Sequence, residues 1–125
     1  GQNPHMTICP SFDFMADVLS QTLHKLLDEE AVAPERIVIL SPYRHTNSQS
    51  TWAAGLKDVD LHTEMNIMVK GKIRIGTIQS FKGLESDVVI LAGLTKQSLT
   101  QDELLYVATS RAKAALYVFS LSALS

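Results

Sequence analysis

The sequence predicts an α/β fold with a mostly parallel sheet and helices on both faces. Two apolar runs rich in β-branched residues, Arg36–Leu40 and Val88–Leu91, have the continuous hydrophobicity of strands that are covered on both sides. Segments with the periodicity of amphipathic helices alternate with the predicted strands. Because such alternation is typical of parallel sheets with right-handed crossovers, we expect three layers, α/β/α.

The chain has the size and composition of one globular domain. It contains 125 residues, of which 46% are apolar. Residues 1–6 resemble the remnant of an expression vector, so we leave them out of the predicted fold and expect a single domain over residues 7–125.

Charge and cysteine usage restrict the partners and the compartment. The net charge is −2, so binding to a polyanion would depend on local groups or on another domain or subunit. Cys9 is the one cysteine, which permits no internal disulfide and favours a reducing compartment. We expect a cytoplasmic protein without a membrane partner, because no apolar stretch approaches the ~20 residues of a membrane span.

The first helix is predicted between Ser11 and Glu30 or Ala31. Ser11 is suited to cap it, and apolar residues recur at three- and four-residue spacing from Met15 to Leu27. His24 lies on this helix. We interpret it as a solvated or core-edge histidine, because no second metal ligand stands at a matching spacing.

The middle of the chain is less regular. The strand at Arg36–Leu40 leads into a polar loop in which Arg44 meets a phosphate or, as we slightly favour, is simply solvated. A helix is predicted from Asn47 or Ser48 to about Leu56. Residues 59–70 have no clear period and form the predicted irregular edge of the sheet, where His62 and Glu64 are too few for a metal site.

A polar turn, Thr77–Glu85, is the segment richest in reactive groups. The apolar run Ile73–Ile78 leads into it, and the strand at Val88–Leu91 follows. Ligands of open α/β sheets lie beyond the strand ends, so hydroxyl, amide, ammonium and carboxylate groups gathered here are candidates for one binding site. The alternative is an ordinary turn whose polar groups only cap the backbone.

The C-terminal part predicts one more helix and one more strand. Thr100–Glu103 has the pattern of a capping box and opens a helix from Gln101 to about Lys113. Arg111 and Lys113 stand at its C-terminal turn, where basic residues are ordinary partners of the helix dipole. The last strand is predicted over Ala115–Phe119.

Two segments resemble motifs of UvrD/Rep-like superfamily 1 helicases. Thr77–Leu91, with the sequence TIQSFKGLESDVVIL, resembles motif V, and Leu104–Lys113, with the sequence LLYVATSRAK, resembles motif VI. Leu40–Asn47 is similar to the first segment of the same domain in that family. The resemblance covers roughly residues 11–120 and implies a RecA-like, P-loop NTPase-like C-terminal motor domain of an ATP-dependent DNA or RNA helicase.

The resemblance also implies roles for individual residues. In that family, ATP lies between two RecA-like domains, and the first of them holds the phosphate-binding loop and the Mg²⁺ ligand. By motif position, Arg111 corresponds to an arginine that contacts the γ-phosphate, and Glu85 to a carboxylate that contacts the ribose. Gly83 and, by a looser alignment, Arg44 are further candidate ATP contacts. A guanidinium stabilises the charge that spreads over the γ-phosphate oxygens during transfer.

A second set of positions corresponds to contacts with single-stranded DNA or RNA. These are Thr77, Gln79 and Ser80, whose polar groups would contact phosphates without reading the sequence. The family usually has histidine where this chain has Gln79, which leaves any coupling role of that position open. Lys82 pairs either with a phosphate or with Glu85, and the sequence does not choose between them.

The sequence lacks the motifs that hold ATP and Mg²⁺ in the first domain. Gly71-Lys72 is followed by Ile73 and is no phosphate-binding loop, and Asp102-Glu103 opens a helix instead of ending a strand. The segment between Arg44 and Thr77 is also too short for the subdomain that larger members insert. We therefore expect a motor half that is inactive without its N-terminal RecA-like domain and holds no metal. Two alternatives stay open: a non-catalytic interaction module on a degenerate motor fold, and a stand-alone nucleotide-binding doubly wound domain.

Overall fold

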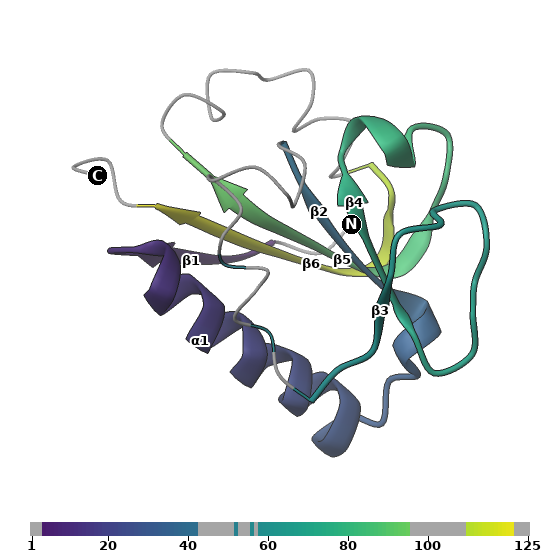
Figure 1. Ribbon diagram of the computed structural model, residues 1–125, viewed down its shortest axis with the longest axis horizontal. Helices are drawn as coiled ribbons and strands as arrows, with labels where there is room; N and C mark the ends of the chain where they lie inside the picture. Colours follow the sequence, from purple (N-terminus) through teal and green to yellow (C-terminus); the bar gives the residue numbers. More distant parts are fainter. Residues whose placement is uncertain (1–3, 43–51, 53–55, 57, 96–109, 122–125) are drawn as a thin grey trace.

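The computed structural model describes residues 4–42, 52, 56, 58–95 and 110–121. Within these ranges, six strands form one sheet in the order β1-β6-β5-β2-β4-β3 (Figure 1). The strands are β1 His5–Cys9, β2 Ile37–Ser41, β3 Leu61–His62, β4 Ile73–Thr77, β5 Ser86–Leu94 and β6 Ala112–Leu121. Each described strand pair is parallel, which confirms the predicted α/β fold with a mostly parallel sheet.

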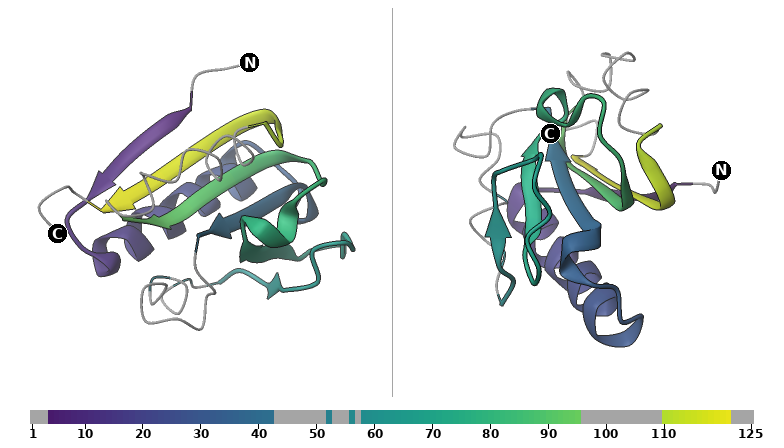
Figure 2. Two further views of the ribbon diagram at one scale, coloured as in Figure 1. Left: turned by 90° about the horizontal axis from the view of Figure 1, so that it is seen from above. Right: turned by 90° about the vertical axis from the view of Figure 1, so that its right-hand side faces the viewer.

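Helix α1, Phe12–His24, covers one face of the sheet (Figures 1 and 2). Ser11 caps it as predicted, because its Oγ accepts a hydrogen bond of 3.1 Å from the backbone N–H of Phe14. A π-helical turn, η1 Lys25–Glu29, continues the helix. Ala31 then has a φ of 54°, which ends the element close to the predicted position. No helix in the described ranges is long and apolar enough to cross a membrane.

Two apolar cores lie on the two faces of the sheet. The core under α1 contains buried residues of α1, β2, β4 and β5: Met15, Leu19, Leu23, Ile39, Ile75 and Ile90. The opposite core contains Val38, Leu40, Val89, Leu91 and Phe81. Phe81 belongs to a 3₁₀ turn, η4 Gln79–Phe81, and a second such turn, η2 Pro34–Arg36, precedes β2. Adjacent strand residues therefore face different cores, which explains the continuous apolar runs of β2 and β5.

The structure corrects the prediction at the start of the chain. His5 and Met6, which we left out of the fold, lie in β1 and pair with Tyr117 and Val118 of β6. The ring of His5 also stacks on that of Tyr117, with centroids 4.6 Å apart. A short strand such as β1 carries little local signal, and only its pairing with a distant strand establishes it.

The structure also corrects the predicted boundary between the last helix and the last strand. β6 begins at Ala112, so Lys113 lies in a strand and not at a helix C-terminus. The cause is the pairing with β5: Ser86 is opposite Ala112, and the Ser86 N–H donates to the Arg111 carbonyl. Residues 101–109 of the predicted helix lie outside the described ranges. Arg44 and most of the helix predicted from Asn47 to Leu56 also lie outside them.

Candidate functional site

The segment between β4 and β5 connects opposite ends of the sheet (Figure 1). Thr77 at the end of β4 pairs with Ser41, whereas Val88 of β5 pairs with Ile37. Those two levels of β2 are four positions, or roughly 13 Å, apart along the strand. Residues 78–85, which we call the crossover, therefore run back along the sheet. Consequently the polar groups predicted to form one cluster are divided between two ends of the molecule.

One group, Thr77, Gln79 and Ser80, lies at the carboxyl end of β4. The Oγ1 of Thr77 accepts from the Ser80 N–H at 3.1 Å, and the Ser80 Oγ donates to the Thr77 carbonyl at 2.7 Å. Both hydroxyls thus cap the turn, as the simpler interpretation of this segment predicts. Among the described residues, the Thr77 hydroxyl is used only as an acceptor. Gln79 and Ser80 are exposed.

Gly83 lies further along the crossover, in a conformation that side chains avoid. Its φ is +83°, and a Cβ built on it would meet no atom within 4 Å. The backbone conformation, and not a lack of space, therefore explains the glycine. The crossover uses this turn to reach the start of β5.

The second group, Glu85 and Arg111, lies at the amino ends of β5 and β6. The N–H of Ser86 donates to the Arg111 carbonyl at 3.0 Å, so Arg111 lies beside the residue that follows Glu85. Glu85 is exposed and Arg111 is half-buried. The Nε of Arg111 is buried and finds no acceptor among the described residues. The structure thus places, at the same end of the sheet, the two residues that the resemblance assigns to contacts with one nucleotide.

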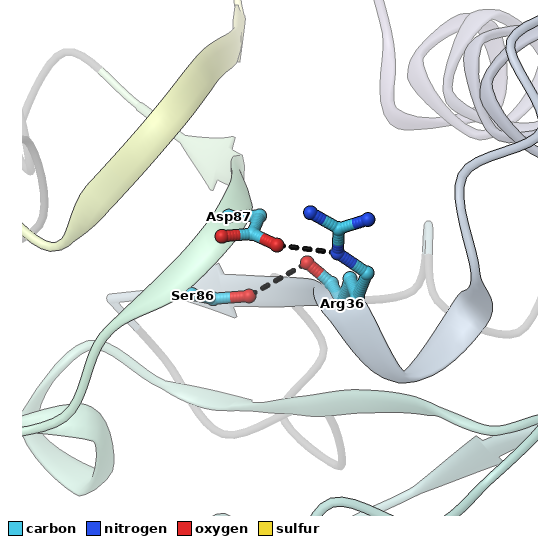
Figure 3. Close-up of polar contacts among 3 residues, drawn as sticks. All are labelled: Arg36, Ser86 and Asp87. Atoms are coloured by element: carbon cyan, nitrogen blue, oxygen red, sulfur yellow. Dashed lines mark hydrogen bonds and ion pairs between the residues drawn. The ribbon is translucent and has the colours of Figure 1, made fainter.

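A polar network that the sequence did not indicate holds the start of β5 (Figure 3). The hydroxyl of Ser86, which is 5% exposed, donates to the Arg36 carbonyl at 2.8 Å. The Nε of Arg36 also forms an ion pair with Asp87. The chain directly after Glu85 is therefore bonded to the last residue of η2, which precedes β2, and to the residue before β6. The contacts of Arg36 with Ser86 and Asp87 span fifty or more positions, which leaves no local sequence signal.

Comparison with solved structures concerns the fold of this chain. The mostly parallel sheet with helices is consistent with a RecA-like α/β fold. The chain is similar to the solved structure of the C-terminal domain of a possible DNA helicase from Lactobacillus plantarum WCFS1. The TM-score is 0.71 at 22% identity, and the match covers 97% of this chain and 75% of that one.

A family model identifies the motif-bearing part of the sequence. Residues 72–119 match the UvrD-like helicase C-terminal domain, which confirms the resemblance over a segment that includes the crossover and Arg111. No match was found among curated proteins.

Proposed function

We propose that this chain is the C-terminal motor half of an ATP-dependent superfamily 1 helicase or translocase on single-stranded DNA or RNA. It would supply Arg111 and Glu85 to an ATP molecule bound by an N-terminal RecA-like domain of the same polypeptide. The observation that supports this proposal is that both residues lie at the amino ends of β5 and β6, beside the hydrogen bond from the Ser86 N–H to the Arg111 carbonyl.

The side chains of Arg111 and Glu85 at this end of the sheet suit a nucleotide. Arg111 is half-buried, and a guanidinium that reaches the surface is a strong donor to anionic phosphate oxygens. The exposed carboxylate of Glu85 is an acceptor for sugar hydroxyls. One guanidinium and one carboxylate do not form a cage for a divalent cation. We therefore expect the N-terminal domain to hold the Mg²⁺ that neutralises phosphate charge when ATP is bound.

The nucleic acid would bind at the other end of the sheet. Thr77, Gln79 and Ser80 present one hydroxyl hydrogen, an exposed amide and an exposed hydroxyl at the carboxyl end of β4. Groups of this kind contact phosphates without sequence preference. The crossover then connects this end to Glu85, so a backbone shift at one site would be transmitted to the other through a few residues of chain.

The decisive experiment measures ATP turnover of the polypeptide in which this chain is joined to its N-terminal domain. Arg111→Ala should lower kcat by about 10³-fold or more, as for an arginine finger. Lys113→Ala is the matched control, because it removes an exposed positive charge from β6 two positions away. Equal rates for Arg111→Ala and the parent would favour the interaction module instead.

The stand-alone alternative has its own test. The 125-residue chain by itself should show no ATP turnover and no tight ATP binding in calorimetric titration, because only one wall of the cleft is present. Stoichiometric micromolar binding of ATP to the isolated chain would favour a self-sufficient nucleotide-binding domain.

A further inference from the structure

A charged residue occupies a position in the sheet where an apolar one would fit. Arg74 of β4 is 4% exposed. Its cross-strand neighbours are Val38 on β2 and His62 on β3, and Val38 is in turn opposite Val89 of β5, so the row is apolar on the side toward β5. Burying a charge is costly unless it is well paired, and an apolar replacement is often as stable or more so.

The contacts of Arg74 compensate for its burial only in part. Its Nη1 donates to the Met65 carbonyl at 2.9 Å, and the guanidinium carbon lies 5.3 Å from the centroid of the Phe81 ring. Its Nε is buried without an acceptor, and no carboxylate pairs with it among the described residues. Burial lowers the pKa of Arg74 below its ordinary value. The core alone therefore gives no reason for an arginine here.

The residue that Arg74 contacts is the anchor of the crossover. Phe81 is 1% exposed, its N–H donates to the Ile78 carbonyl at 3.2 Å, and its own carbonyl accepts from the Leu84 N–H at 3.1 Å. The exposed Gln79 and Ser80 directly precede it. A displacement of Phe81 from its buried position would therefore also displace the two exposed residues that precede it.

We propose that Arg74 is a positioning residue that holds the crossover in place through Phe81, so that Gln79 and Ser80 face single-stranded nucleic acid. The planar guanidinium suits this role, because it stacks on the ring while its edge donates to the Met65 carbonyl. A lysine ammonium can make the hydrogen bond but stacks less well. The nucleic-acid part of this inference rests on the proposed function, whereas the positioning part does not.

The positioning is tested by amide hydrogen exchange on the 125-residue chain. In Arg74→Met, exchange at Phe81, Lys82 and Leu84 should accelerate by about 3- to 30-fold, the range expected for loss of one cation–π contact. Exchange at Ile90, in the middle of β5, should change much less. Equal acceleration at Ile90 and in the crossover would mean a general loss of stability and would overturn the proposal.

A second variant keeps the test decisive if Arg74→Met folds poorly. Phe81→Leu removes the ring and leaves the bond between Arg74 and Met65 intact. It should loosen the same crossover amides, and the double variant should be little worse than either single one, because both remove the same contact. Fully additive effects on exchange would overturn the proposal.

The functional arm measures affinity for a fluorescent single-stranded oligonucleotide at fixed salt. Arg74→Met should weaken binding about 3- to 30-fold, with partial recovery in Arg74→Lys. Lys72→Met is the control for lost charge, because Lys72 is exposed and lies two positions away. An equal loss in Lys72→Met would count against positioning. Absence of binding by the unmutated chain would count against the proposed function alone, since the exchange measurement needs no ligand.

Discussion

Replacing Gly93 by alanine should destabilise the chain through two separate effects. Gly93 has a φ of +75° and lies where the pairing of β5 with β6 shifts register between Leu91 and Leu94. A Cβ at this position would lie 2.5 Å from Nε1 of Trp52, a distance that ordinary packing does not allow. The indole is 1% exposed, so it has little room to retreat.

The size of the effect follows from these two terms. An L-residue in the left-handed region costs about 1–2 kcal/mol, and overpacking a core costs about 1–3 kcal/mol. Gly93→Ala should therefore lower the free energy of unfolding by about 2–5 kcal/mol, a large part of the roughly 5–15 kcal/mol of a typical domain.

The matched control is Gly71→Ala, which isolates the backbone term. Gly71 has a φ of +83°, and a Cβ there would meet nothing within 4 Å. We expect a loss of only about 1–2 kcal/mol for this variant. Urea unfolding followed by fluorescence suits the measurement, because Trp52 is the only tryptophan and is buried. If both variants lost the same stability, the predicted clash with Trp52 would be wrong.

Three further outcomes are expected. Ser86→Ala should cost about 0.5–1.5 kcal/mol in urea unfolding, because it removes the donor to the Arg36 carbonyl; no loss would show that this bond does not hold the start of β5. The hydrogen bond from the Gly71 N–H is the main cause that lowers the pKa of Glu35 in the folded chain. The Glu35 carboxylate therefore stabilises the fold above about pH 4.3, and this stabilisation is lost as the pH falls through the lowered pKa of the folded state. The difference in unfolding midpoint between Glu35→Gln and the parent should therefore shrink on acidification, and a constant difference would contradict this. Burial raises the pKa of the Cys9 thiol, so a disulfide reagent at neutral pH should react far more slowly with native than with unfolded chain.

Local sequence patterns were sufficient for the elements whose signal lies within a few residues. The cap at Ser11, the apolar stripe of α1 and the continuous runs of β2 and β5 all appear in the structure where the sequence predicts them. The short irregular edge near His62 is also confirmed as the two-residue strand β3. The cap, the helical stripe and the continuous apolar runs are all readable from neighbouring positions, whereas the edge was predicted from its lack of a clear period.

The motifs in the crossover and at Arg111 indicated a family, but not how their residues lie in space. The sequence suggested one polar cluster between β4 and β5. The structure separates Thr77 from Glu85 and places Glu85 beside Arg111 instead. Parallel pairing causes both results, because a connection between parallel strands must return along the sheet before the next strand begins.

The sequence by itself determined the fold class, most of the strands and the helicase resemblance, because hydrophobic periodicity and short motifs are local properties. Only the tertiary structure decided that β1 includes His5 and Met6, that Arg36 holds the start of β5, and that Arg74 is buried beneath Phe81. The pairings of β1 and Arg36 join residues fifty or more positions apart, and the burial of Arg74 depends on strand order. No pattern along the chain records such contacts before the sheet has formed.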